Sequence, residues 1–124
     1  MIDTCRKVLP RDTIASADSG AHRILLSQMW ECYAPRTLLQ STGLCTMGCA
    51  LPLAMGVKHA RQEAPVIGFM GDAGLEMVLG ELATLRALGY SPLAVAIGLA
   101  LDLTLRNRYT DVTLDDYMRL LWQK

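Results

Sequence analysis

One short segment constrains the fold more than any other: an apolar run that leads directly into a tight glycine turn and a helix start. Residues 66–70 are apolar, residues 71–74 read Gly-Asp-Ala-Gly, and a helical pattern begins at Leu75. A helix start offers unpaired N–H groups to an anion, and glycines let the backbone approach that anion closely. Asp72 adds a hard oxygen ligand for Mg2+. The turn therefore predicts a phosphate and metal site, for which other segments must supply further ligands.

Strands and helices are expected to alternate along the chain. β-compatible and apolar runs predict strands at residues 13–17, 37–40, 65–70 and 93–97, the last buried on both faces. Helical spacing predicts helices at residues 21–30, 47–61, 75–88 and 110–124. Such alternation implies βαβ units. We therefore predict an α/β fold class, a three-layer α/β/α domain with a mostly parallel sheet.

Two details of these helices are also predicted. The apolar residues of the 75–88 helix form one inward stripe, at positions 75, 78, 79, 82, 85 and 88, and Gly89 is its C-cap. Pro52 falls inside the 47–61 run, and it alternatively marks the first turn of the regular helix.

Composition indicates one domain that needs a partner. Residues 1–124 are predicted to form a single domain, because the length suits one core. The formal net charge is zero, which favours neither a nucleic-acid partner nor an anionic membrane surface. Hydrophobic residues make up 52% of the chain and charged residues 19%. We therefore expect an oligomer, or a covering partner domain.

The expected compartment is the cytoplasm. Residues 1–10 contain charged side chains where a secretory signal would need a continuous apolar core. The longest apolar run, 93–101, is too short to cross a membrane. The four cysteines contain no CxxC pair and receive no redox role. Cys45 and Cys49 are spaced as two ligands on one helical face would be, but small buried thiols are the favoured interpretation.

Three motifs follow one another in the chain. Residues 18–22 read Asp-Ser-Gly-Ala-His, residues 41–52 read Ser-Thr-Gly-Leu-Cys-Thr-Met-Gly-Cys-Ala-Leu-Pro, and the 71–74 turn precedes Glu-Leu-Ala-Thr at 81–84. In order and separation they resemble the D-x-G-x-H, G-x-x-x-M-G-x-x-L-P and G-D-G/A … E-L-x-T motifs of the thiamine diphosphate-dependent enzymes of the acetolactate synthase and benzoylformate decarboxylase type. The resemblance covers about residues 13–97 and implies the C-terminal, thiamine diphosphate-binding fold of that family.

The resemblance implies a role for each matching residue of the glycine turn. Asp72 is the Mg2+ ligand, and the metal bridges to the diphosphate of the cofactor. Gly71, Ala73 and Gly74 line that diphosphate at the helix start. Without the motifs, Asp72 could equally be an N-cap residue.

The resemblance also implies roles in the two earlier motifs. Met47 lies at the apolar pivot that holds the two cofactor rings in a bent conformation, and the main-chain carbonyl of Cys45 accepts a hydrogen bond from the 4'-amino group. His22 lies near the diphosphate or the substrate pocket. The structural alternatives are a core methionine and a turn histidine, and for His22 both interpretations stay open.

The sequence departs from the family pattern at the second metal ligand. The family has an Asn shortly after the strand that follows the glycine-turn helix, whereas Leu99 or Ala100 occupies that place here. Neither side chain can bind Mg2+. Asp102 is the nearest oxygen donor and is a candidate metal ligand, with a solvent-facing side chain as its alternative.

The second departure concerns activity. In the family, the glutamate that activates the cofactor lies on a separate pyrimidine-binding domain, which is not found in this chain. We therefore assign no catalytic residue and expect the chain alone to be inactive. The predicted function is the diphosphate- and Mg2+-binding subunit or fragment of a thiamine diphosphate-dependent 2-oxo acid decarboxylase or acetolactate synthase-like lyase, in a homo- or hetero-oligomer with a pyrimidine-binding partner.

Two alternatives remain. The first is a non-catalytic, degenerate domain that keeps the fold and the dimer surface but has lost metal binding. The second is another nucleotide or phosphate binder that uses the same strand-turn-helix unit. The second is disfavoured because neither GxxxxGK[ST] nor GxGxxG occurs at the turn.

Overall fold

The fold is a four-stranded parallel sheet flanked by helices. The computed structural model describes residues 2–90 and 93–97, the latter by their backbone alone. The strands are β1 (Ile14–Ala17), β2 (Leu38–Gln40), β3 (Val66–Met70) and β4 (Leu93–Ile97), in the order β2-β1-β3-β4 with every pairing parallel. The predicted α/β fold class and all four predicted strands are confirmed, with ends that differ by at most one residue.

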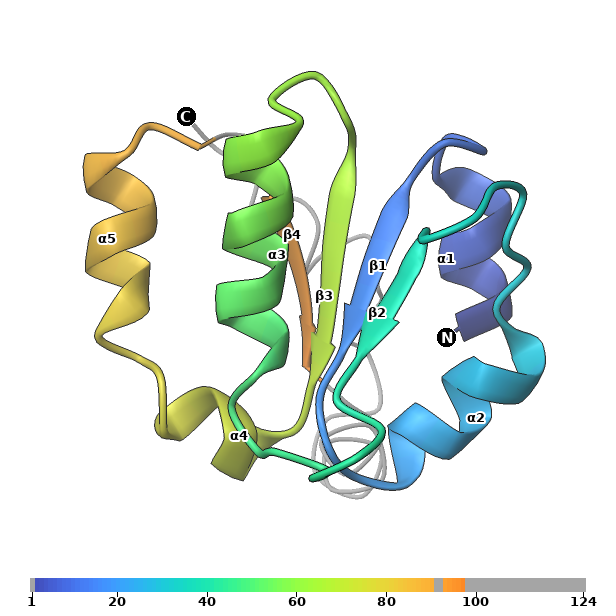
Figure 1. The fold of residues 1–124 in the computed structure, drawn as a ribbon, viewed down its shortest axis with the longest axis horizontal. Helices are drawn as coiled ribbons and strands as arrows, with labels where there is room; N and C mark the ends of the chain where they lie inside the picture. The colour runs from blue at the N-terminus through green and yellow to red at the C-terminus, as the bar shows by residue number, and fades with distance from the viewer. Residues whose placement is uncertain (1, 91–92, 98–124) are drawn as a thin grey trace, which may run out of the picture.

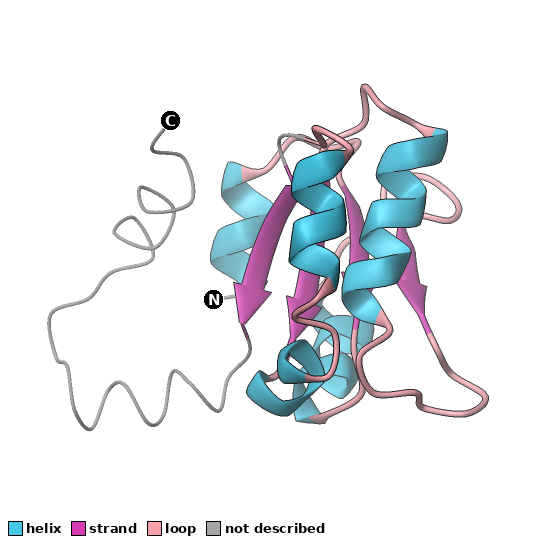
Figure 2. Cartoon of the chain, turned by 90° about the vertical axis from the view of Figure 1, so that its left-hand side faces the viewer, coloured by secondary structure: helices cyan, strands magenta, loops and turns pink. Residues whose placement is uncertain are grey.

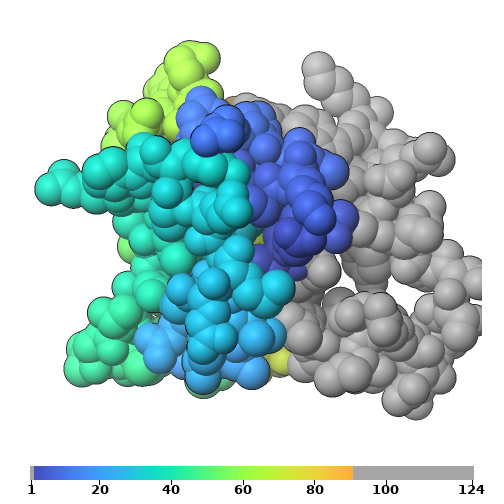
Figure 3. Space-filling view, turned by 90° about the vertical axis from the view of Figure 1, so that its right-hand side faces the viewer, coloured from blue at the N-terminus to red at the C-terminus, as the bar shows by residue number. Residues whose placement is uncertain are grey.

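Helices cover both faces of this sheet, as Figure 1 shows. Helices α1 (Ile2–Val8) and α2 (Ala21–Met29) lie on one face, and α3 (Ala50–Ala60) and α5 (Glu81–Ala87) lie on the other. Figure 2 views the second face, with α3 and α5 in front of the strands. Figure 3 views the first face, where α1 and α2 lie next to each other. The short helix α4 (Asp72–Glu76) lies below the carboxyl ends of the strands (Figure 1).

Large side chains fill the α1/α2 face. Alternate strand residues point toward these helices and are fully buried, and the ring of Phe69 meets Trp30 edge to face with centroids 5.4 Å apart. The guanidinium of Arg6 lies 4.6 Å over the Trp30 ring. This cluster consists of Ile2, Cys5, Ala15, Ala17, Leu26, Trp30, Ile67 and Phe69. Helix α1, which has a place in this core, was not predicted from the sequence.

Small residues let α3 approach the opposite face closely. Ser16 donates its hydroxyl to the carbonyl of Ala50 at 2.7 Å, which ties β1 to the first residue of α3. A β-carbon added at Gly68 would lie 3.8 Å from that of Ala54. Pro52 occupies the first turn of α3, so the alternative start is the correct one and the expected start at residue 47 is wrong. A proline there costs no intrahelical hydrogen bond.

The single helix predicted at residues 75–88 is wrong. The chain forms two short helices, α4 and α5, separated by turns at residues 77–80. At this junction, main-chain N–H groups donate to the carbonyl three residues earlier. Glu81 donates to Val78 at 2.9 Å, and Leu82 donates to Leu79 at 3.1 Å. These tighter bonds, with Gly80 at the junction, keep a helix-like periodicity but break the helix axis.

The inward stripe of that helix is also only partly correct. Leu75, Val78 and Leu85 pack against the core of the α3 face, but Leu79, Leu82 and Leu88 are exposed by 49%, 38% and 51%. The C-cap prediction is confirmed: Gly89 has a φ of 65° and donates to Arg86, while Tyr90 donates to Leu85.

The cysteines differ from the favoured interpretation. Cys5 is buried, Cys49 is half-buried, and Cys32 and Cys45 are exposed; all four thiols are free. Cys45 and Cys49 do not share a helical face, because both precede α3. The predicted helix at residues 110–124 lies outside the described residues, as do the side chains of β4. None of the described helices is long and apolar enough to cross a membrane.

Candidate functional site at the carboxyl end of the sheet

The predicted site segments meet where β1 and β3 end. These strands are neighbours in the centre of the sheet, and the N–H of Asp18 bonds the carbonyl of Phe69 at 2.9 Å. The loop after β1 leads to α2 on one face, while the loop after β3 leads to α4, whose Leu75 packs on the other face. Loops that diverge in this way open a crevice at the carboxyl ends of parallel strands, the usual ligand position in open α/β sheets.

A buried carboxylate joins two of these segments. Asp18 is 1% exposed, and its Oδ2 accepts a hydrogen bond from the N–H of Gly48 at 2.9 Å. Its Oδ1 accepts one from the N–H of Ser19 at 2.8 Å. The thiol of Cys49 lies 3.7 Å from the carbonyl oxygen of Ala17 and 3.9 Å from Oδ1. Burial, followed by the charge of Asp18, raises the pKa of this thiol, which favours its protonated, donating form.

Glycines at two positions make this junction possible. A β-carbon added at Gly74 would overlap Oδ2 of Asp18 and lie 3.0 Å from its Cγ. Gly48 has a φ of 77°, in the left-handed region, and a β-carbon there would lie 3.1 Å from Val78. We call Asp18, Gly48 and Gly74 the Asp18 junction. It brings the turn before α3 and the first turn of α4 against the end of β1.

His22 lies beside the glycine turn. The residue is 6% exposed, and a β-carbon added at Gly71 would be 3.9 Å from its Cε1. Nε2 has no hydrogen-bond partner among the described residues. Burial lowers the pKa of His22, an effect that Asp18 partly opposes. The site therefore holds a neutral imidazole whose Nε2 can form one further hydrogen bond.

Asp72 is the first residue of α4, but it is not the N-cap. That position belongs to Gly71, which makes no side-chain capping bond. Asp72 is exposed, and none of the described residues donates a hydrogen bond to its carboxylate. The N-cap interpretation is therefore wrong, and the carboxylate is free of any capping role. Ala73 is exposed next to it, whereas Gly74 is buried.

The loop at residues 41–49 passes beneath the ends of β1 and β3 toward α4 (Figure 1). Met47 is 46% exposed, so the core-methionine interpretation is wrong. Cys45 has a φ of 49°, which is uncommon for a residue with a β-carbon and marks local backbone strain. Strain of this kind tends to occur at ligand sites, where the surrounding structure holds it.

The described residues do not form a complete metal site. Among residues 2–90, no three His, Cys, Asp or Glu side chains converge to hold an ion. Asp72 is the available carboxylate at the glycine turn. Asp102, Leu99 and Ala100 lie outside the described residues.

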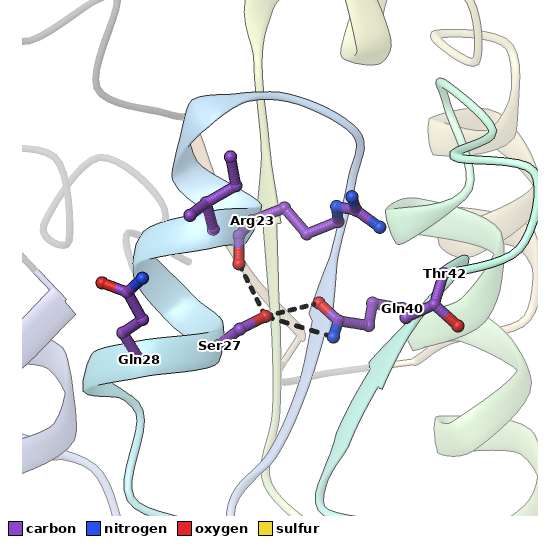
Figure 4. Close-up of a pocket in the computed structure, with 6 residues that line it drawn as sticks. Arg23, Ser27, Gln28, Gln40 and Thr42 are labelled. Atoms are coloured by element: carbon purple, nitrogen blue, oxygen red, sulfur yellow. Dashed lines mark hydrogen bonds between the residues drawn. The ribbon is translucent and has the colours of Figure 1, made fainter.

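A separate groove of about 300 Å3 lies between α2 and β2 (Figure 4). Ser27 and Gln40 face each other across it with hydrogen bonds of 3.2 Å, and Arg23 donates to the carbonyl of Ser41 at 3.2 Å. Its lining, Arg23, Ile24, Ser27, Gln28, Gln40 and Thr42, contains none of the predicted site residues.

Comparison with known proteins agrees with this geometry. The sequence profile described as "Thiamine pyrophosphate enzyme, C-terminal TPP binding domain" matches residues 18–98. The chain belongs to this family. Thiamine pyrophosphate is thiamine diphosphate, so the family resemblance expected from the motifs is confirmed. The matched region begins at Asp18 and includes the glycine turn.

Relatives of this thiamine diphosphate enzyme domain are acetolactate synthases. The chain is 38% identical to the acetolactate synthase of Mycobacterium leprae over 97 residues, which are 78% of the chain and 15% of that relative. It is 35% identical to the acetolactate synthase isozyme 3 large subunit of Escherichia coli over 109 residues, 88% of the chain and 18% of that relative. The chain therefore spans less than a fifth of the length of these relatives.

Sequence reasoning missed the role of Asp18. The motif placed this residue in the opening turn, but it gave no reason to join it to Gly48, which is 30 residues away. The sequence offered only a weak signal. Asp18 directly follows a buried strand, and a glycine rather than a larger residue stands at position 74, inside the helix α4.

Proposed function

We propose that this chain binds the diphosphate and Mg2+ of thiamine diphosphate as one part of a 2-oxo acid decarboxylase or acetolactate synthase-like lyase. The observation that carries the proposal is the convergence of three motif segments at the carboxyl ends of β1 and β3. These are the turn with His22, the loop with Cys45 and Met47, and the glycine turn with Asp72.

The glycine turn suits a metal-bound diphosphate. Asp72 offers an exposed carboxylate oxygen to Mg2+, and the metal offsets the repulsion between that carboxylate and a diphosphate. Gly71, Ala73 and Gly74 line the diphosphate in this proposal. Asp102 is a proposed second ligand.

The other two segments contribute contacts of different kinds. Met47 supplies apolar surface for the cofactor rings, and its exposure leaves that surface available. Cys45 offers its main-chain carbonyl, whose direction is set by the left-handed backbone. His22, kept neutral by burial, donates or accepts one hydrogen bond at Nε2 instead of forming an ion pair.

Thiamine diphosphate, when bound, supplies carbanion stabilisation for chemistry beside a carbonyl group. This chain's residues hold and orient it, and activation is proposed to require a pyrimidine-binding partner domain. Exposed apolar side chains near the site support such a partner. Leu44, in the loop before α3, is 89% exposed, and Met77, directly after α4, is 67% exposed.

Calorimetry tests the proposal directly. Thiamine diphosphate is titrated into the chain with and without Mg2+, alone and with the pyrimidine-binding domain of an acetolactate synthase. We expect Mg2+-dependent binding that the added domain tightens. Asp72→Ala should remove the Mg2+ dependence, whereas Glu76→Ala, an exposed acid on the same helix, should not. Absence of binding under every condition would refute the proposal.

A non-catalytic domain that has lost metal binding is the alternative. It is favoured by Leu99 at the place of the family's Asn ligand. Leu99→Asn should then increase the Mg2+-dependent affinity for thiamine diphosphate. An unchanged affinity would count against a lost ligand at this position.

A further inference from the structure

We propose that Asp18 is a positioning residue, which sets the distance between the loop of Met47 and the glycine turn of Asp72. The contacts of Asp18 are observed in the structure, whereas its effect on a ligand rests on the function proposed above. The inference concerns a residue that touches neither diphosphate nor metal: both carboxylate oxygens are directed at main-chain N–H groups, and the residue is 1% exposed.

The first contact is with the loop before α3. Hydrogen bonds to charged acceptors are short and strong, and here one carboxylate oxygen accepts from the N–H of Gly48 at 2.9 Å while the other accepts from the N–H of Ser19 at 2.8 Å. Removing the carboxylate leaves the buried N–H of Gly48 without this acceptor. Because Gly48 directly follows Met47, loss of the bond frees the Met47 segment.

The second contact is with α4 and is steric. Gly74 lies so close to the carboxylate that an added β-carbon would overlap Oδ2, and the same β-carbon would be 3.6 Å from the nitrogen of Gly48. The carboxylate thus fills the space that an alanine would need. Gly74 is two residues after Asp72, so the packing at Asp18 fixes where the first turn of α4 lies.

These two contacts make positions 18 and 74 dependent on each other. With Asp18 present, Gly74→Ala forces the carboxylate and α4 apart. With Asp18→Ala, the space is free, and alanine is the better helix former. We therefore expect Gly74→Ala to lower the melting temperature in the unaltered chain and to leave it unchanged or raise it in the Asp18→Ala background. Equal losses in both backgrounds would overturn the proposed contact.

A second experiment separates positioning from general stability. Asp18→Asn keeps the size of the side chain but replaces one acceptor oxygen with a donor. The control is Lys58→Met, which removes the buried 3.0 Å bond from Lys58 to Ala64 at the far end of α3. We expect Asp18→Asn to weaken Mg2+-thiamine diphosphate binding at least tenfold and to speed amide exchange at Gly48. The Lys58→Met control should change the binding affinity and the rate of amide exchange at Gly48 by less than twofold.

The outcomes distinguish the two proposals. Asp18 has no positioning role if each variant weakens binding only in proportion to the fall in its melting temperature. The same conclusion follows if Asp18→Asn leaves binding unchanged. If the unaltered chain binds no thiamine diphosphate, the proposed function fails and the effect on binding fails with it. The coupling between positions 18 and 74, measured by melting alone, then still decides whether the junction exists.

Discussion

The two faces of the sheet use different kinds of packing. On the α1/α2 face, Phe69, Trp30 and Leu26 form a closed core, and each is at most 6% exposed. On the α3 face, the strands present Ser16 and Gly68 beside the fully buried Met70, which packs with residues of α3 in a smaller core without aromatic rings, and no residue of α5 is buried.

This difference indicates a division of roles. The first face buries large apolar surface, which dominates the free energy of folding. The second face brings α3 close to the strands, so that the turn at Gly48 reaches Asp18, and it leaves Leu82 of α5 and Leu88, directly after that helix, exposed. The first face thus holds the larger aromatic core, and the second positions the proposed site and carries the exposed leucines proposed to meet a partner.

The largest expected effect tests the closed face. Phe69→Ala removes a fully buried ring from the contact with Trp30. We expect it to lower the free energy of unfolding by about 3–5 kcal/mol. Urea denaturation followed by circular dichroism measures the change.

The control is Phe69→Leu, which keeps most of the apolar volume and should be less destabilising. A loss below about 1 kcal/mol for Phe69→Ala would contradict the assignment of the main core to this face.

The next largest effect tests close packing on the other face. A side chain at Gly68 would meet Cε of Met70 at 3.0 Å and Oγ of Ser16 at 3.4 Å. Gly68→Val should push α3 outward and cost about 1–3 kcal/mol in urea denaturation.

Gly56 on α3 provides the matched control, because nothing lies within 4 Å of its added β-carbon. Gly56→Ala should stabilise the domain by about 0.5–1 kcal/mol. If Gly68→Val does not destabilise the domain, the sheet and α3 are not closely packed at this position.

A third prediction concerns pH and the buried His22 at the carboxyl ends of the strands. Burial lowers the pKa of His22 below its ordinary value of 6.5, so the unfolded chain binds a proton more readily than the folded one. Stability should therefore fall as the pH drops through 6.5 toward the folded pKa. Urea denaturation between pH 8 and pH 5 should show a weaker pH dependence for His22→Gln.

His59→Gln is the comparison, since it removes the exposed histidine of α3. If that substitution flattens the pH dependence as much as His22→Gln does, the buried imidazole is not the source.

The smallest effect on stability is expected on α5. Leu82→Ser should lower the free energy of unfolding by only about 1 kcal/mol, because the residue is 38% exposed and no residue of α5 is buried. The same variant should weaken binding to a pyrimidine-binding domain, measured by calorimetry.

Val8→Ser is the matched control, as it alters an exposed apolar side chain of α1 on the other face. Equal weakening by both variants would refute a partner surface at α5.

Much of the fold could be predicted from local patterns. The runs that became β1 and β3, and the glycine at position 89, depend on neighbours within a few residues. The break between α4 and α5 could not be read in this way, because the apolar spacing of a 3₁₀-type connection imitates one continuous helix. The exposure of Leu79 and Met47 also follows from which elements cover them, and not from their spacing.

The sequence by itself determined the alternation of strands and helices and the family, and it predicted the chemistry of the glycine turn. Only the tertiary structure decided how the turn is held. Asp18, Gly48 and Gly74 are distant in the chain, and they meet because parallel pairing of β1 with β3 brings the carboxyl ends of both strands together. A buried carboxylate with main-chain partners depends on this long-range pairing, which local periodicity does not encode.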